Sequence, residues 1–198
     1  MTSDFKTRKA MQSDAGDLAI LDDIASHGLA HWLWYGAVIA DQCDTALERG
    51  RERMAEQSPY GFSNAHVAIR DEVIIGSVID YPMVFEGPPQ SMGPIADPVL
   101  KPSFELWAII NGDWYVDSLA VFTPERGNGV ARALLDIAKS RAIKNNKSAI
   151  SLITQDDNAA AISLYQSSGY AIVDRRPFIP FNKFSKTKEW LLLTAPLN

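Results

Sequence analysis

Apolar and polar residues alternate along this chain with two different periods. Short runs rich in β-branched and aromatic residues predict strands, and apolar residues that recur at helical spacing predict helices. The order of the predicted elements is typical of an α/β domain with a mixed central sheet of about seven strands flanked by helices. The strands are expected at residues 5–10, 64–70, 73–81, 114–122, 149–154, 170–177 and 188–195.

The predicted helices carry start and stop signals. Ser13-Asp14 suits the beginning of a helix, Gly28 suits its end, and Asn158 suits the cap of the last helix. In the helix after Val130, the residues expected to face the core are Leu134, Ile137, Ala138 and Ile143. Helices are expected over residues 13–28, 41–57, 104–110, 130–146 and 158–169.

Residues 82–103 break this pattern, because prolines stand at positions 82, 88, 89, 94, 98 and 102. Proline lacks a backbone N–H and is rare inside helices and central strands. We therefore expect a loop insertion here. The whole chain, residues 1–198, has a length typical of one domain with a full core.

The most informative stretch covers residues 114–135. An apolar strand ends at Phe122, a proline and a glycine-rich turn follow, and a helix begins near Val130. Gly127 and Gly129 permit backbone conformations in which successive N–H groups converge on one point. The helix start adds N–H groups and the positive end of its dipole. This arrangement is suited to binding a phosphate or pyrophosphate.

Two common phosphate loops do not fit this turn. A P-loop carries Lys and then Ser or Thr after its last glycine, whereas Val130-Ala131 follow here. A dinucleotide-binding turn has three glycines, whereas two stand here. Arg126 would add a charged contact to an anion at the rim. An ordinary strand-to-helix turn without a ligand is the alternative.

Two motifs resemble those of the GNAT family of N-acetyltransferases. Arg126-x-x-Gly129-x-Ala131 is similar to the family's acetyl-CoA loop, and the segment from Asn158 to Tyr170 is similar to its later Asn, Ala, Leu-Tyr and Gly-Phe/Tyr pattern. Both stand in the family's order and spacing, and the resemblance is strongest over residues 112–177. It implies a GNAT-like acyl-CoA N-acyltransferase fold and a transferase that uses acetyl-CoA.

The resemblance also implies which residues bind acetyl-CoA, the acetyl-donating cosubstrate. In the family the glycine loop holds the pyrophosphate, and the strand before it pairs with the pantetheine arm. A backbone N–H near a bulge in that strand polarises the thioester carbonyl. The residues implied here are Leu119, Ala120, Val121, Arg126, Gly127, Asn128, Gly129, Val130, Ala131, Arg132, Asn158 and Tyr165.

Acetyl transfer to an amine also requires proton transfers. The family places a tyrosine hydroxyl at the leaving sulfur, and Tyr165 matches it, with a core aromatic as the alternative. Asp117 on the predicted central strand is the first candidate for the base, and its alternative is a structural hydrogen-bond acceptor. Glu105 is the second candidate, and attack by a free amine without an enzyme base is a third possibility.

The acceptor is expected to be a primary amine on a small molecule or peptide. In the family, the segment after the first strand often covers the acceptor site. The aromatic residues within 31–36 are therefore either a wall over the acceptor or, as their apolar pattern favours, a helix packed on the core. The insertion at 82–103 is expected to be a lid or an oligomer contact, and homodimers are common in the family.

Composition limits the classes of partner and the cellular location that we expect for this protein. The net charge is −5, which disfavours nucleic acid as a partner. Cys43 is the only cysteine, so an internal disulfide and a cysteine-based metal cluster are excluded. The N-terminus has no signal-peptide pattern and no apolar run is long enough to span a bilayer. We expect a cytoplasmic protein with no metal and no membrane partner.

Two other functions are consistent with parts of this pattern. A sensor or regulatory module could bind acetyl-CoA without turnover, although a tyrosine at the sulfur is not needed for binding alone. A nucleotide-binding protein is disfavoured by the missing Lys-Ser/Thr. We expect direct transfer in a ternary complex, because Cys43 lies far in sequence from the two motifs and no serine nucleophile is indicated.

Overall fold

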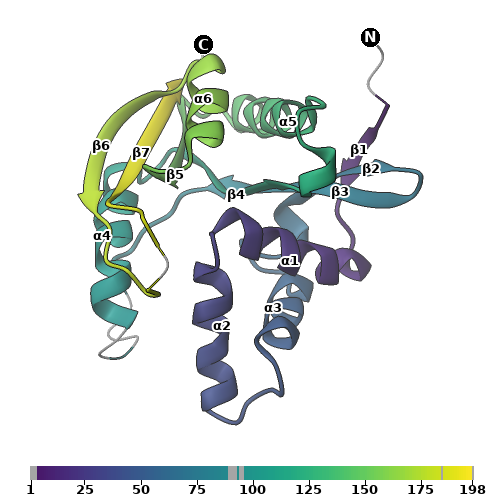
Figure 1. Ribbon diagram of the computed structural model, residues 1–198. Coiled ribbons are helices and arrows are strands. Elements are labelled where there is room, and N and C mark those ends of the chain that lie inside the picture. Colours follow the sequence, from purple (N-terminus) through teal and green to yellow (C-terminus); the bar gives the residue numbers. More distant parts are fainter. Residues whose placement is uncertain (1–3, 89–92, 94–95, 184, 198) are drawn as a thin grey trace. The chain divides into compact units, whose positions relative to one another are not determined.

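The computed structural model describes residues 4–88, 93, 96–183 and 185–197 (Figure 1). Among these residues, seven strands form one mixed sheet in the order β1-β2-β3-β4-β5-β7-β6. The strands are β1 (Lys6–Lys9), β2 (Ala65–Arg70), β3 (Val73–Pro82), β4 (Trp114–Val121), β5 (Ala149–Gln155), β6 (Ala171–Pro177) and β7 (Glu189–Pro196). Each lies within one residue of its expected bounds, which confirms the predicted α/β class.

The strand pairs show why the sheet is mixed. β1–β2, β2–β3, β5–β7 and β6–β7 are antiparallel, and β4 and β5 are parallel. The register between β2 and β3 shifts between Ala68 and Ile69, and Ala68 lies opposite Gly76. A Cβ atom on Gly76 would lie 2.8 Å from the Ala120 carbonyl oxygen, so this glycine permits β3 to approach β4 closely.

The helices are α1 (Ala15–Ala25), α2 (Leu29–Ile39), α3 (Ala46–Ala55), α4 (Ala96–Ile109), α5 (Val130–Lys144) and α6 (Ala159–Ser167), with short 3-10 turns at Gln12–Asp14, Phe62–Asn64 and Thr123–Glu125. The aromatic stretch lies in α2, where Trp34 is buried and Tyr35 is exposed. In the part of the chain that the structure covers, no helix combines the length and apolarity needed to cross a bilayer.

Two expectations about helices are wrong. Residues from Ala96 onward are helical rather than irregular, whereas residues 89–92 and 94–95 lie outside the described part. Pro98 lies in the first turn, where its missing N–H would have no intrahelical partner, and burial of Val99, Leu100 and Leu106 favours the helix despite Pro102.

The second correction concerns Ile143, which was expected to face the core and is 52% exposed. Ala138 and Ala142 are fully buried in α5 and lie four residues apart on one face. The next residue is rotated by about 100° around the helix axis, because an α-helix has 3.6 residues per turn. Ile143 therefore points away from the buried face.

The chain divides into two compact units. The first contains residues up to Tyr81 together with Asp117–Ser140. In this unit α3 packs against both α1 and α2, and α1 and α5 lie on opposite faces of the strands (Figure 1). Its core includes Leu18, Leu21, Met54, Val67, Ile79 and Leu134.

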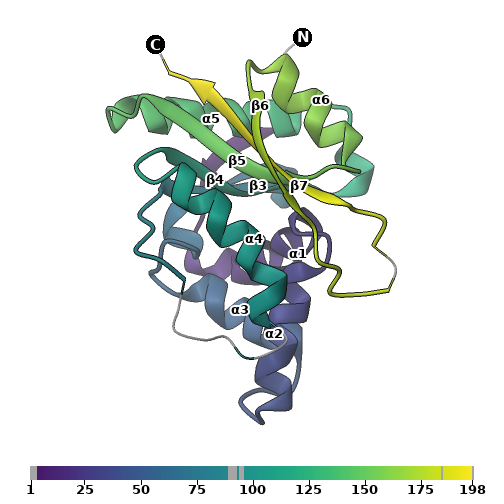
Figure 2. The ribbon, with the colours of Figure 1, turned by 90° about the vertical axis from the view of Figure 1, so that its left-hand side faces the viewer.

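The second unit contains Pro82–Val116 and the residues from Arg141 onward. α4 packs beside β6 and β7, and α6 lies on the other side of these strands (Figure 2). An aromatic cluster of Phe85, Phe104, Trp107 and Tyr115 joins α4 to β4, with ring centroids 5.4–6.3 Å apart. Its core includes Leu106, Ile150, Leu152, Leu192 and Leu193.

Candidate active site

The glycine-rich turn has the backbone geometry that its sequence predicts. Gly127 and Gly129 have φ angles of +81° and +80°, in the left-handed region that favours glycine. A Cβ atom on either residue would meet nothing within 4 Å, so the turn borders open space. The Ala133 N–H donates to the Gly129 carbonyl oxygen at 3.1 Å, which closes the first turn of α5. The N–H groups before Ala133 therefore face the helix end, as anion binding requires.

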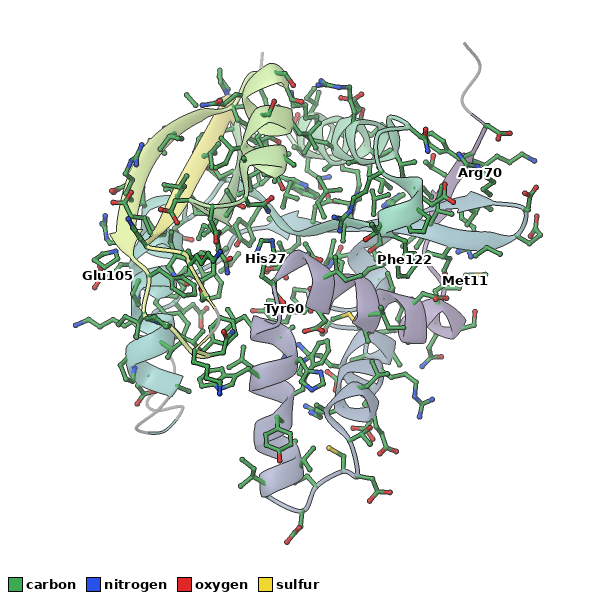
Figure 3. All side chains as sticks on the ribbon, viewed as in Figure 1. Met11, His27, Tyr60, Arg70, Glu105 and Phe122 are labelled. Atoms are coloured by element: carbon green, nitrogen blue, oxygen red, sulfur yellow. The ribbon has the colours of Figure 1, made fainter. Side chains whose placement is uncertain are left out.

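Side chains anchor this turn from both sides. Arg126 Nε donates to the Val121 carbonyl oxygen at 3.0 Å, and Asn128 Nδ2 donates to the Glu125 carbonyl oxygen at 3.3 Å. The Glu125 carboxylate pairs with Arg70 of β2, which also donates to the backbone oxygen of Asp4 (Figure 3). These contacts connect the turn to the ends of β4 and β2, so its shape is set before a ligand binds.

Two aspartates of the first unit interact electrostatically. Asp117 comes from β4 and Asp22 from α1, and both side chains are half-buried. The pKa of Asp117 is raised to about 7, mainly by burial and also by the charge of Asp22, against the opposing effects of Arg53 and a hydrogen bond from Tyr81. This places the pKa of the carboxyl well above its usual value, in the range that suits exchange of a proton near neutral pH.

The surroundings of Asp22 shift the pKa of its carboxyl in the same direction. The pKa of its carboxyl is raised to about 6, mainly by burial and also by the charge of Asp23. The charge of Arg53 opposes this rise. The two carboxyls thus interact within one polar site.

Aromatic residues of the first unit border this site. The ring of Tyr81 on β3 meets that of Tyr60 edge to face, with centroids 5.4 Å apart. The guanidinium carbon of Arg53 lies 4.9 Å from the centroid of the Tyr60 ring, which is a cation–π distance (Figure 3). Tyr60 is 41% exposed, so this aromatic edge of the site is accessible to solvent.

The second unit holds the other predicted catalytic residue. Asn158 caps α6, because its Oδ1 accepts a hydrogen bond from the Ala161 N–H at 3.4 Å. Tyr165 lies two turns later, is buried, and contacts the ring of Tyr170 at a centroid distance of 5.9 Å. Burial raises the pKa of Tyr165 to about 12, so its hydroxyl keeps its proton throughout the physiological range.

Glu105 is less suited to be a base. Its carboxylate projects from α4 and lies 2.9 Å from Arg176 Nε, and its side chain is 47% exposed (Figure 3). This carboxylate is therefore committed to an ion pair at the surface of α4. The geometry therefore favours Asp117 over Glu105.

Sequence reasoning missed four residues around Asp117, namely Asp22, Arg53, Tyr60 and Tyr81. Only Asp22 carried a local signal. It follows Leu18 by four residues, which places a carboxylate on the buried face of α1. The described residues contain no group of three or more His, Cys, Asp or Glu side chains that could hold a metal ion.

Known proteins share both the sequence pattern and the fold. The chain is 34% identical over 61 residues, 31% of its length, to N-alpha-acetyltransferase 30 of Saccharomyces cerevisiae, and it spans about a third, 35%, of that protein. The Salmonella typhimurium acetyltransferase yncA, solved with its cofactor acetyl-CoA, has a TM-score of 0.62 at 17% identity, covering 98% of this chain and 94% of that chain. A chain of the NatC complex bound to Gag peptide and CoA has a TM-score of 0.58 at 16% identity. The match covers 98% of this chain and 99% of that chain.

These structures show the fold, and the sequence profile shows the family. The profile of the acetyltransferase (GNAT) family matches residues 34–170, which is more than half of the chain and includes the glycine-rich turn, Asp117 and Tyr165. The chain belongs to the acetyltransferase (GNAT) family.

Proposed function

We propose that this protein is an acetyl-CoA-dependent N-acetyltransferase that acts on a primary amine by direct transfer in a ternary complex. Its family membership supports acetyl transfer. The observation that carries the proposal is Asp117, a half-buried carboxyl with its pKa raised to about 7, on the strand that leads into the anion-binding turn.

The turn supplies the donor-binding part of the proposal. The positive φ angles of Gly127 and Gly129 and the open space beside them suit the pyrophosphate of acetyl-CoA. Val130, Ala131 and Arg132 contribute the first turn of α5, and Arg126 and Asn128 complete the loop. The backbone of Leu119, Ala120 and Val121 is assigned to the pantetheine arm and the thioester carbonyl, and Asn158 to the pantetheine.

Asp117 and Tyr165 divide the proton transfers. Asp117 accepts a proton from the acceptor ammonium, and the freed nitrogen lone pair attacks the thioester carbonyl. Tyr165 donates its phenolic proton to the departing sulfur, and the proton that the new amide nitrogen releases restores the phenol. Asp117 then gives its proton to solvent, so one ammonium and one thioester yield an amide, a thiol and a proton.

The ordinary pKa values of amines support a peptide N-terminus as the acceptor. An α-amino group has a pKa of about 8, whereas a lysine-type amine has a pKa of about 10.4. Proton transfer to a carboxyl with a pKa of about 7 is therefore less uphill for the α-amino group. The yeast relative and the peptide-bound NatC complex support this choice, and a small-molecule amine is the alternative acceptor.

The proposal is tested in two steps. Calorimetric titration with acetyl-CoA and with CoA measures binding, and we expect micromolar dissociation constants. An assay of thiol release with peptides that differ in their first residues, and with small amines, then measures transfer. Binding without transfer to any acceptor would favour a sensor, and absence of binding would contradict the donor site.

A further inference from the structure

Glu125 places a carboxylate directly before the glycine-rich turn. It ends the short 3-10 turn Thr123–Glu125, and Gly127 follows two residues later. The N–H groups of this turn and of the start of α5 are suited to an anion, so a negative charge beside them repels a pyrophosphate. Anion binding here is therefore favoured when the charge of Glu125 is compensated.

Arg70 supplies the compensating charge. It is the last residue of β2 (Figure 3), and its Nη1 donates to Glu125 Oε2. The Arg70 side chain is 24% exposed and that of Glu125 is 22% exposed, so both charges are largely withdrawn from solvent. Water and salt screen such a pair less than an ion pair at the surface. Removal of Arg70 would leave the Glu125 carboxylate without a counterion.

Asp4 also contacts Arg70 but contributes little charge to the pair. Arg70 Nε donates to the backbone oxygen of Asp4 at 3.0 Å, and the Asp4 carboxylate lies 3.5 Å from the same nitrogen. The Asp4 side chain is almost fully exposed, so solvent screens its charge. The contact therefore orients the guanidinium, and Nη1 remains directed at Glu125.

Glu125 is also joined to the turn through its backbone. Its carbonyl oxygen accepts a hydrogen bond from Asn128 Nδ2 at 3.3 Å. Its N–H donates to the Phe122 carbonyl oxygen at 2.9 Å, and the Phe122 N–H donates to that of Ile75 on β3 at 3.0 Å. These bonds do not involve Arg70, so we expect the Glu125 carboxylate to stay beside the turn when Arg70 is replaced.

Resting on the proposed function, we propose that Arg70 is a positioning residue that sets the affinity for acetyl-CoA by holding and neutralising the Glu125 carboxylate. Arg70 acts through Glu125 and not on the reacting atoms. Its effect therefore belongs to binding of the donor and not to the transfer step.

Arg70→Met tests this role, because it removes the charge and keeps a long side chain. We expect the dissociation constant of acetyl-CoA, measured by calorimetry, to rise by about tenfold, and KM for acetyl-CoA to rise with it. The value of kcat at saturating acetyl-CoA should stay within about twofold of that of the unmodified protein. Arg70→Lys keeps the positive charge and should retain most of the affinity.

Glu125→Gln distinguishes an effect of charge from an effect of structure. The double variant Arg70→Met/Glu125→Gln lacks the ion pair but has no uncompensated carboxylate. We expect its dissociation constant to lie within about twofold of that of the unmodified protein. A double variant that binds as weakly as Arg70→Met would overturn the proposal.

Glu125→Gln alone keeps the proposal testable if Arg70→Met fails to fold. It should bind acetyl-CoA at least as tightly as the unmodified protein, because it removes a negative charge and leaves that of Arg70. Weaker binding by Glu125→Gln would contradict the role of Arg70 in neutralising this carboxylate.

Arg8→Met is the matched control. Arg8 pairs with Asp14 at 2.6 Å in the same unit, and this ion pair is likewise shielded from solvent. The substitution should lower the free energy of unfolding, measured with urea, and leave acetyl-CoA affinity unchanged. An equal loss of affinity in Arg8→Met and Arg70→Met would show a general loss of stability instead of a specific role.

Failure of this inference differs from failure of the proposed function. Acetyl-CoA binding that ignores Arg70→Met would overturn the inference alone. The expected pattern of affinities without transfer to any amine would overturn the proposed function and leave the role of Arg70 in binding. Absence of acetyl-CoA binding by the unmodified protein would overturn both.

Discussion

At the scale of single residues, the same physical effect acts on both residues that we propose to transfer protons, Asp117 and Tyr165. Burial disfavours the charged form of both side chains. It brings the pKa of Asp117 to about 7, where the carboxyl can accept and release a proton, and that of Tyr165 to about 12, where the phenol remains a donor. These different pKa values are the reason why we propose Asp117 as the base and Tyr165 as the acid.

Removal of the Tyr165 hydroxyl tests its role as the acid. Tyr165→Phe keeps the buried ring, so acetyl-CoA affinity should change little. We expect kcat to fall by about 100-fold or more, the usual contribution of a positioned proton donor. Steady-state kinetics and calorimetry on the same preparation measure both quantities.

Tyr170→Phe is the matched control, because Tyr170 is a buried neighbour of Tyr165. Its kcat should stay near that of the unmodified protein. Equal turnover in Tyr165→Phe would remove Tyr165 as the acid.

At the scale of elements, the turn between β4 and α5 requires glycine because of its backbone conformation, and not because a side chain would lack space. An added Cβ at Gly129 would meet no atom within 4 Å, but its φ of +80° is unfavourable for other residues. Glycine therefore serves to aim the N–H groups. A carboxylate at this position would be attracted to the helix N-terminus and would compete with a bound anion for the same N–H groups.

Two substitutions compare this turn with a glycine of positive φ outside it. Gly129→Glu should weaken acetyl-CoA binding by more than about tenfold, because it combines strain with repulsion of the pyrophosphate. Gly112→Ala is the control, since its φ is +100° with similarly open surroundings, and it should leave affinity unchanged. Unchanged affinity in Gly129→Glu, measured by calorimetry, would contradict the loop assignment.

The contact between α2 and α3 gives a stability prediction for elements. A Cβ on Gly50 would lie 2.5 Å from the ring of Trp34, so Gly50→Ala should lower the free energy of unfolding by about 1–3 kcal/mol. Gly36→Ala, in α2 with nothing within 4 Å, should instead raise it by up to about 1 kcal/mol. Urea unfolding measures both, and equal effects would show that α2 and α3 do not pack this closely.

At the scale of the whole molecule, the aspartate pair couples function to stability. A carboxyl whose pKa is raised on folding stabilises the native state while it is protonated. That contribution is present below the unfolded pKa of about 3.9 and is lost as the pH rises through the folded values of about 6 and 7. At neutral pH the ionised carboxyls therefore lower the free energy of unfolding. The same rise in pKa makes Asp117 a stronger base.

This cost predicts how Asp117→Asn changes stability with pH. The free energy of unfolding of the unmodified protein, relative to that of the variant, should fall between about pH 4 and pH 8. Urea titrations at several pH values measure the difference. Asp17→Asn should show a much smaller change, because Asp17 is exposed. A difference that rises with pH would contradict the sign of the Asp117 pKa shift.

Local signals determined much of the fold and of the donor site. Strand periodicity located every described strand to within one residue, and the glycine-rich turn was identified because positive φ angles and helix starts are properties of neighbouring residues. The prediction of a loop was wrong for the first part of α4, because the prolines there indicated irregular structure. The burial that stabilises this helix comes from packing against other elements, which local sequence does not show.

The surroundings of Asp117 were decided only by the tertiary structure. Its pKa depends on Asp22, Arg53 and Tyr81, which come from three other elements and are distant from it in sequence. Desolvation and charge interactions act through space, so sequence spacing cannot predict them. The sequence by itself determined the strand, the turn and the candidate residues, and the packing of helices against strands determined which of these residues can exchange a proton near neutral pH.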